Sequence, residues 1–121
     1  MKKILVFDDE EAIRMLYELE LSEEGYEVIC SGEASRCMEL IWDHRPNVVV
    51  MDKKMGTHDG LEVLRNIRDR FPALPLVLCT AYPSHDSEKG DKVADFYAAK
   101  SSDLEELKVK VKAAMELRRA T

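Results

Sequence analysis

Short runs of apolar residues alternate along this chain with longer segments in which apolar residues recur every three or four positions. The apolar runs predict buried β-strands at residues 3–7, 26–30, 48–51, 76–79 and 96–99. The longer segments predict α-helices at residues 10–24, 34–44, 61–70 and 84–93, with a final helix that Asp103 begins. Five strands alternating with five helices favour an α/β fold, with a parallel sheet covered on both faces.

The predicted helices differ in how strongly the sequence supports them. The first ends at Gly25, which suits a left-handed C-terminal cap. Its apolar face is formed by Ile13, Leu16, Tyr17, Leu19 and Leu21, and the matching stripe of the last helix by Leu104, Leu107, Val111, Ala114 and Met115. The fourth is the weakest, because Ser, Asp, Lys and Gly dominate it and only Val93 and Ala94 are expected to be buried.

Right-handed crossovers between parallel strands leave few ways to order this sheet. The simplest is a doubly wound five-stranded sheet of order 2-1-3-4-5, in which the first and third strands are neighbours. The chain shows no linker, internal repeat or low-complexity segment, so we expect one domain over residues 1–121. Ligands of such sheets bind at the carboxyl ends of the strands, where the strand order reverses.

Polar residues stand at the carboxyl ends of four predicted strands. The first strand is followed by Asp8, Asp9 and Glu10, the third by Asp52, the fourth by Thr80 and the fifth by Lys100. Converging carboxylates repel one another unless a divalent cation neutralises them, and a lysine pairs well with a further anion such as a phosphoryl group. The pattern therefore indicates a metal-assisted phosphoryl site.

Composition narrows the classes of partner. The 121 residues include 18 Lys and Arg against 24 Asp and Glu, for a net charge of −6. Binding of nucleic acid or anionic lipid needs clustered basic residues, so we expect neither as a direct partner. The amino-terminal apolar run is too short for a secretory signal, and no segment has the length of a membrane span. The three cysteines lack metal-ligand spacing, so we expect them reduced, in the cytoplasm.

Several motifs, in this order along the chain, resemble the receiver domain of two-component response regulators. They are ILVFDDE at residues 4–10, GYEV at 25–28, Asp52 with DGLEVL at 59–64, Thr80-Ala81 and Lys100. The resemblance spans nearly the whole chain and implies a flavodoxin-like fold. It also implies that a histidine kinase or a histidine phosphotransfer protein donates a phosphoryl group. Phosphorylation would then change a protein-interaction surface that a downstream effector domain or protein recognises. The domain would catalyse only its own phosphorylation and dephosphorylation.

The resemblance also implies the roles of individual residues. Asp52 would be the phosphoacceptor, and Asp9 and Asp52 would bind Mg²⁺ directly. Asp8 would act largely through a bound water, and the backbone carbonyl of Lys54 would complete the protein ligands. This set suits Mg²⁺, which takes few carboxylates and keeps several waters.

The remaining roles belong to the phosphoryl group and to the switch. Thr80 would donate a hydrogen bond to a phosphoryl oxygen, and Lys100 would balance the charge. Tyr97 matches the switch aromatic of the family, filling space that Thr80 leaves on moving toward the phosphoryl group. Lys54 and Tyr82 would flank the path of the water that hydrolyses the aspartyl phosphate.

Two positions depart from the pattern of the family. Ser101 follows Lys100 where the family usually has a proline, often with a cis bond. A cis bond before a residue other than proline costs about 2.5–4 kcal/mol, so we expect a trans Lys100–Ser101 bond. Gly56 stands where the loop after Asp52 usually has a proline, so we expect a more mobile loop with a less firmly placed Lys54 carbonyl.

Three other functions compete with this interpretation. A magnesium-dependent phosphatase needs a second acid soon after the nucleophile, and Lys53 and Lys54 supply none. A cofactor-binding flavodoxin needs a phosphate cradle after the first strand, where the acidic run would repel phosphate. A phosphorylation-independent pseudo-receiver remains the alternative because both prolines are missing. Whether the chain acts alone or was cut from a longer regulator also stays open.

Overall fold

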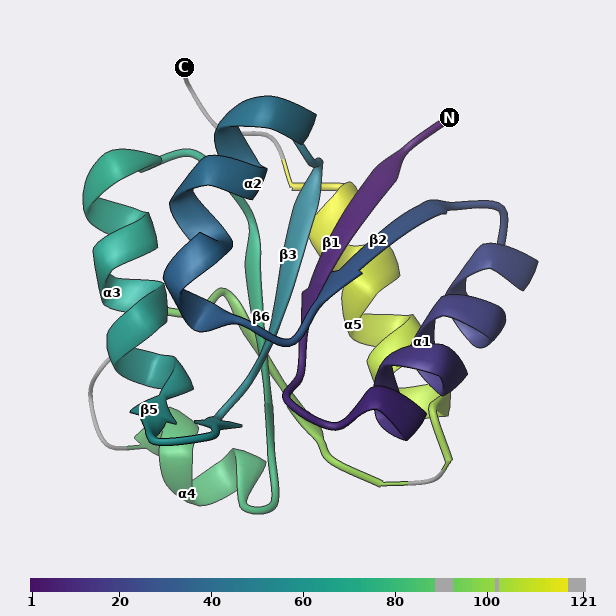
Figure 1. Ribbon diagram of the computed structural model, residues 1–121. Helices are drawn as coiled ribbons and strands as arrows, with labels where there is room; N and C mark the ends of the chain where they lie inside the picture. Colours follow the sequence, from purple (N-terminus) through teal and green to yellow (C-terminus); the bar gives the residue numbers. More distant parts are fainter. Residues whose placement is uncertain (89–92, 102, 118–121) are drawn as a thin grey trace.

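Five parallel strands form the central sheet of the computed structural model, which describes residues 1–88, 93–101 and 103–117 (Figure 1). The strands are β1 (Lys3–Phe7), β2 (Glu27–Ser31), β3 (Val48–Asp52), β6 (Leu76–Thr80) and β7 (Phe96–Ala99). They are ordered β2-β1-β3-β6-β7, and each neighbouring pair is parallel. The predicted order 2-1-3-4-5 is confirmed, and each strand begins and ends within one residue of its prediction.

Helices cover both faces of this sheet. They are α1 (Glu11–Glu23), α2 (Cys37–His44) after a 3₁₀ turn η1 (Ala34–Arg36), α3 (Gly60–Arg70), α4 (Pro83–Glu88) and α5 (Glu105–Met115). Figure 1 shows α2 and α3 on one side of the sheet and α1 and α5 on the other. The fourth predicted helix begins one residue early, and its predicted continuation over 89–92 lies outside the described residues. Across the described ranges, no helix combines the length and apolarity that crossing a membrane requires.

The core is divided between the two faces by the period of the strands. Because successive strand side chains point to opposite faces, Ile4 and Val6 pack toward α1 and α5, whereas Leu5 and Phe7 pack toward α2 and α3. The same alternation holds in β3 and β6, whose residues are all buried. Burial on both faces explains why these strands are continuous apolar runs in the sequence.

The apolar face of α1 is narrower than the sequence predicts. Tyr17 and Leu21, one helical turn apart, are buried against the sheet. Leu19, predicted to share that face, is 56% exposed. It lies two positions from each of them and so points roughly the opposite way around a helix of about 3.6 residues per turn.

The segment after β3, predicted as a loop, is a small hairpin. Strands β4 (Lys54–Met55) and β5 (His58–Asp59) pair antiparallel. Gly56, at the turn, has a φ of +59°, which glycine adopts without strain. The side chain of Met55 is buried in the core and anchors the hairpin. Greater mobility of this segment stays a prediction.

The first residues of two helices are positioned by aspartate side chains. Asp59 accepts a hydrogen bond from Leu61 N at 2.9 Å and caps α3. The sequence predicts Asp103 as the cap of the last helix, but Leu104 occupies the capping position, so this prediction is wrong by one residue; the Asp103 side chain still accepts a hydrogen bond from Glu105 N at 3.0 Å. At the start of α3, a methyl group on Gly60 would collide with the backbone carbonyl of Asp52, so only glycine lets this helix approach the end of β3.

Two leucines of α1 test this assignment of the core. Leu21→Ala should lower the free energy of unfolding by about 2–5 kcal/mol, because the side chain is fully buried. Leu19→Ala, on the exposed side of the same helix, should change it by less than about 0.5 kcal/mol. Urea denaturation followed by circular dichroism measures both, and equal losses would contradict the assigned orientation of α1.

Candidate functional site

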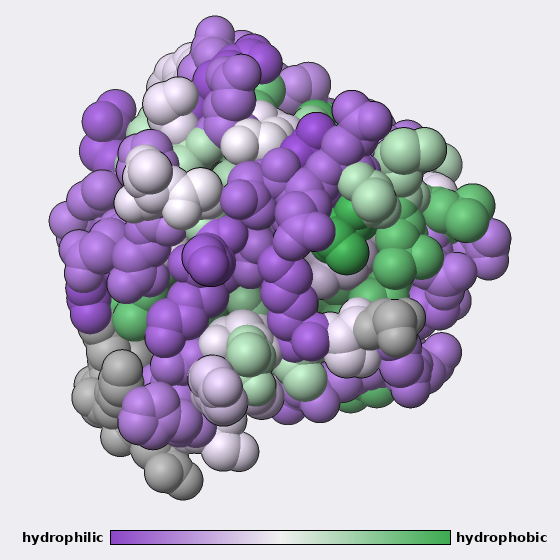
Figure 2. Space-filling view, turned by 60° about the horizontal axis from the view of Figure 1, so that its bottom comes forward, coloured by the Kyte–Doolittle hydropathy of each residue, from purple (hydrophilic) through white to green (hydrophobic). Residues whose placement is uncertain are grey.

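The polar residues that follow the strands meet at one edge of the sheet. This edge is at the bottom of Figure 1 and is turned forward in Figure 2, where its surface is mainly hydrophilic with a hydrophobic area to one side. A pocket of about 570 Å³ opens here. It is lined by Asp52, Lys53, Lys54, Thr57, His58, Asp59, Thr80, Ala81, Tyr82 and Lys100. The structure therefore brings the predicted Asp52, Thr80 and Lys100 to one pocket.

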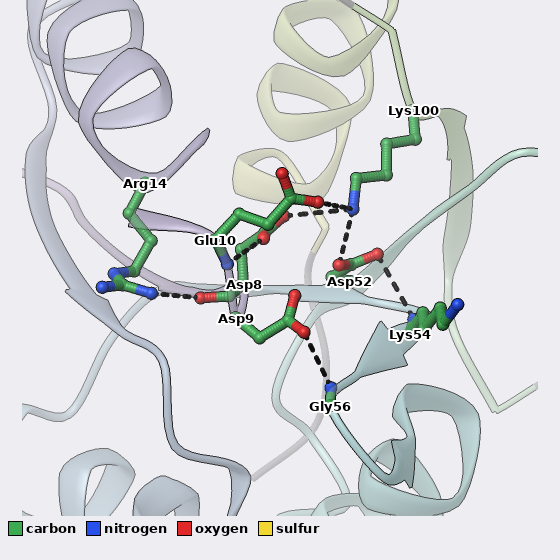
Figure 3. Close-up of polar contacts among 8 residues, drawn as sticks. All are labelled: Asp8, Asp9, Glu10, Arg14, Asp52, Lys54, Gly56 and Lys100. Atoms are coloured by element: carbon green, nitrogen blue, oxygen red, sulfur yellow. Dashed lines mark hydrogen bonds and ion pairs between the residues drawn. The ribbon is translucent and has the colours of Figure 1, made fainter. Parts of the chain in front are cut away.

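Asp52 is the last residue of β3 and is 2% exposed. Its Oδ2 accepts a hydrogen bond from Lys100 Nζ at 2.7 Å, and its Oδ1 accepts a longer one from Lys54 N at 3.3 Å (Figure 3). The central position of β3 in the sheet fixes the backbone of Asp52. The carboxylate is thus held at the pocket wall from both sides.

Lys100 contacts three carboxylates at once. Besides Asp52, its Nζ lies 3.5 Å from Asp8 Oδ2 and 3.9 Å from Glu10 Oε1. Burial alone would lower the pKa of Lys100, but the hydrogen bond and charge of Asp52, with the charges of Asp8 and Glu10, raise it above the usual value. No peptide bond between described residues is cis, so the predicted trans Lys100–Ser101 bond is confirmed.

A cluster of carboxylates lies beside Lys100. Asp8, Asp9 and Glu10 each offer an oxygen within 4.8 Å of the others. Asp8 is fully buried, and its Oδ1 accepts a hydrogen bond from Glu10 N at 2.9 Å. Among the described residues, nothing donates a hydrogen bond to Asp8 Oδ2. A buried oxygen without a donor, among further carboxylates, fits a hard divalent cation.

Burial dominates the titration of Asp8. Desolvation raises its pKa, the hydrogen bond from Glu10 N lowers it, and the negative charge of Asp52 raises it again, giving a value of about 6. The ionised form of Asp8 is therefore disfavoured in the folded protein relative to an unfolded chain.

The predicted metal ligands are only partly gathered. Asp8 and Asp9 cluster with Glu10 rather than with Asp52, whose carboxylate is paired with Lys100. Glu10 stood in the predicted acidic run but was assigned no ligand role. The Lys54 side chain points away from the acids in Figure 3, and its backbone N–H binds Asp52. The ligand role of the Lys54 carbonyl stays a prediction.

The N–H of Gly56 makes a contact that a proline, the residue expected at this position from the family resemblance, could not make. Its N–H donates a hydrogen bond to Asp9 Oδ2 at 3.0 Å (Figure 3). Proline has no N–H, and its fixed φ is incompatible with the +59° found here. The departure from the family pattern at residue 56 therefore ties the hairpin directly to a predicted metal ligand.

Thr80 is bound to a residue that sequence reasoning missed. Its side chain is 2% exposed, and its hydroxyl donates a hydrogen bond to Asp86 Oδ2. Asp86 lies in α4 and is 1% exposed, so the expectation that Val93 and Ala94 are the only buried residues of this segment is wrong. The polar composition of α4 gave no sign in the sequence that Asp86 points inward.

Tyr97 lies apart from the pocket that contains Asp52. It is half-buried in β7 against the core cluster beneath α2 and α3. It also lines a groove of about 520 Å³ between α4, β7 and α5, with Pro83, Ser84, Ser87, Asp95, Phe96, Glu106 and Lys110. The structure thus places Tyr97 in a groove bordered by α4 and α5, and its switching role stays a prediction.

Comparisons with known proteins agree with this geometry. The family described as response regulator receiver domain matches residues 4–112. The response regulator TrrA of Thermotoga maritima, solved in complex with Mg²⁺ and beryllium fluoride, is 38% identical with a TM-score of 0.85, covering 94% of this chain and 99% of its own. TrrA in complex with the histidine kinase ThkA matches with the same identity and TM-score, covering 94% and 98%. CheY4 of Vibrio cholerae shares the fold, with 24% identity and a TM-score of 0.83 over 94% and 98% of the two chains.

The raised pKa of Asp8 predicts how stability depends on pH. The pKa of Asp8 is about 6 in the folded protein and 3.8 in an unfolded chain, so between these pH values the folded protein binds more protons. The free energy of unfolding therefore falls as the pH rises from 3.8 to 6, and the whole loss is present above pH 6. Asp8→Asn removes this cost and should raise the melting temperature of metal-free protein at pH 7.5. The gain should vanish near pH 4.

Thermal unfolding in a metal chelator across this pH range is the measurement. Asp103→Asn, at an exposed carboxylate that accepts a hydrogen bond from Glu105 N, is the control and should show no such gain at pH 7.5. A pH-independent effect of Asp8→Asn would contradict the assigned burial of the charge.

Proposed function

This chain belongs to the family of response regulator receiver domains, and from that premise we propose that Asp52 accepts a phosphoryl group from a phosphohistidine. The donor would be a histidine kinase or a histidine phosphotransfer protein. One observation carries the proposal: the Asp52 carboxylate is held 2.7 Å from Lys100 Nζ, in a pocket that Thr80 also lines, beside the Asp8, Asp9 and Glu10 cluster. The histidine kinase bound to TrrA supports this class of partner.

The proposed transfer exchanges one bond to phosphorus for another. An oxygen of Asp52 forms a bond to phosphorus while the bond from phosphorus to the histidine nitrogen breaks, and the electron pair of that bond stays on the nitrogen. Such transfers need alignment and neutralised charge more than covalent help from the protein. Lys54 N and Lys100 Nζ orient the two carboxylate oxygens of Asp52, and the ammonium of Lys100 balances the charge of the arriving group.

We further propose Mg²⁺ as the cofactor. Asp8, Asp9 and Asp52 would hold it with the carbonyl of Lys54, and Glu10 lies close enough to Asp8 and Asp9 to assist. When bound, Mg²⁺ supplies positive charge next to the phosphoryl oxygens. The buried Asp8 Oδ2 and the Mg²⁺ present in the TrrA complex support this assignment.

Thr80 and Tyr97 are the proposed switch. The Thr80 hydroxyl would donate a hydrogen bond to a phosphoryl oxygen, and Tyr97 would move into the space that Thr80 leaves. Phosphorylation then changes the face of α4, β7 and α5 by favouring one of two conformations, for recognition by a downstream effector. The chain catalyses only its own phosphorylation and dephosphorylation in this proposal.

A phosphorylation-independent interaction module is the second candidate. The observation that favours it is the hydrogen bond from Gly56 N to Asp9, because it satisfies a predicted metal ligand with a protein donor. In this alternative the acidic edge is a structural element, and partners recognise a single conformation.

Phosphoryl uptake distinguishes the two candidates. Incubation with Mg²⁺ and acetyl phosphate should add one phosphoryl group to the wild-type protein, as measured by intact mass spectrometry. Asp52→Asn should abolish the gain, because the acceptor oxygen is lost. Asp59→Asn, at an exposed carboxylate of the same pocket, is the matched control and should retain it. An unmodified wild-type protein would favour the interaction module.

The lifetime of the aspartyl phosphate tests the proposed water path. Lys54 is exposed, Tyr82 is 70% exposed, and both line the pocket beside Asp52. The double substitution Lys54→Asn, Tyr82→Ala should shorten the lifetime severalfold, because smaller side chains leave the path of water open. Loss of the phosphorylated mass over time measures it, with Lys112→Asn on α5 as the control. An unchanged lifetime in the double variant would argue against shielding by these side chains.

A further inference from the structure

We infer that Asp86 holds the Thr80 hydroxyl in the unphosphorylated protein and thereby opposes the phosphorylated conformation. Asp86 is then a positioning residue, which acts through Thr80 and not on the phosphoryl group itself. This inference rests on the proposed phosphorylation of Asp52, and it adds a residue in α4 that limits how readily the switch operates.

The contact between Thr80 and Asp86 is buried, and both carboxylate oxygens of Asp86 have polar partners. Asp86 is 1% exposed, its Oδ2 accepts a hydrogen bond from the Thr80 hydroxyl, and its Oδ1 lies 2.7 Å from Lys53 Nζ. A buried carboxylate is costly unless it is paired and hydrogen-bonded. Both oxygens of Asp86 meet this requirement, and Lys53 supplies the opposite charge.

Thr80 cannot serve Asp86 and a phosphoryl group together. A threonine hydroxyl has one proton to donate, and in this structure Asp86 accepts it. The Thr80 oxygen accepts a hydrogen bond from Tyr82 N at 3.2 Å. Phosphoryl oxygens likewise need a donor, so Thr80 can bind one only by turning its proton away from Asp86. The two hydrogen bonds exclude each other.

Breaking the Thr80–Asp86 contact has an energetic consequence. Hydrogen bonds to a charged group are stronger than those between neutral groups, and a buried acceptor that loses its donor is penalised. Thr80 therefore leaves behind a buried carboxylate with one partner fewer. The contact with Asp86 stabilises the unphosphorylated conformation by this difference.

The same contact ties the switch residue to a helix. Asp86 N donates to Tyr82 O at 3.0 Å within the first turn of α4, and Lys53 directly follows Asp52 in the chain. Asp86 thus links α4 to the ends of both β6 and β3. Since Pro83, Ser84 and Ser87 of α4 border the groove that contains Tyr97, release of Thr80 frees the helix that forms one wall of this groove.

The test weakens the acceptor without changing its shape. Asp86→Asn keeps an oxygen that can accept from Thr80 but removes the negative charge. Beryllium fluoride with Mg²⁺ serves as the phosphoryl mimic, and isothermal titration calorimetry measures its affinity. We expect Asp86→Asn to bind the mimic about tenfold more tightly than the wild type, which corresponds to about 1.4 kcal/mol.

Two controls separate this role from a merely structural one. In a Thr80→Ala background, Asp86→Asn should leave the affinity for the mimic unchanged, because there is no hydroxyl to hold. Asp95→Asn weakens another mostly buried ion pair, in which Asp95 Oδ2 lies 2.9 Å from Arg68, and should lower the melting temperature without raising the affinity. If Asp95→Asn tightened binding equally, general loosening of the fold would explain the effect and the inference would be overturned.

A measurement on the wild-type protein tests the inference without relying on variants that must fold. Hydrogen exchange at the Asp86 amide should become faster when Mg²⁺ and beryllium fluoride bind, because α4 loses its tie to Thr80; unchanged exchange would overturn the inference.

The result also distinguishes this inference from the proposed function. A wild type that is phosphorylated, with an Asp86→Asn variant of equal affinity, overturns the role of Asp86 alone. A wild type that takes up neither phosphoryl group nor mimic overturns both.

Discussion

The ammonium group of Lys100 is the positive charge on which the acidic edge of the sheet depends. It lies within 4 Å of oxygens of Asp8, Glu10 and Asp52, all of which arrive from strand ends that the parallel sheet forces together. Without this charge, the buried Asp8 and Asp52 would face each other across a region of low dielectric, where repulsion is strong. Lys100 offsets only part of the negative charge at this edge of the sheet. The remaining negative charge makes the edge suitable for a divalent cation.

The scaffold around this charge holds Asp52 firmly in place and departs from the pattern of its family in the hairpin that follows. Burial of β3 on both faces and the close approach of Gly60 to its last carbonyl hold the backbone of Asp52. The hairpin that follows uses Gly56 to bind Asp9. A glycine at this position therefore provides a hydrogen bond that proline could not, and this bond ties the conformation of the hairpin to the position of Asp9.

The proposed switch has a defined physical route from the site to α4. Thr80 lines the pocket of Asp52, yet it donates its proton to Asp86 in α4, and Asp86 also pairs with Lys53, the residue after Asp52. Under the proposed phosphorylation, this one hydroxyl proton has two competing acceptors and behaves as a two-position element, which is what coupling between distant sites requires. The described part of α4 is polar, and among residues 83–87 no apolar side chain is buried, which suits this role because few buried apolar contacts there oppose its movement.

The alternation of apolar runs and helical periods determined the strands, the strand order and the common edge at which Asp8, Asp52, Thr80 and Lys100 meet. These features follow from local periodicity and from the handedness of crossovers, so they can be predicted from a single sequence. Tertiary structure alone decided the burial of Asp86 by Thr80 and Lys53, the tie of Gly56 to Asp9, the grouping of Glu10 rather than Asp52 with the first two acids, and the exposure of Leu19. The polar contacts among these join residues as far as 47 positions apart, as Gly56 and Asp9 are. Such pairings are set by how packed elements approach each other, and no local pattern of hydrophobic and polar positions records that approach.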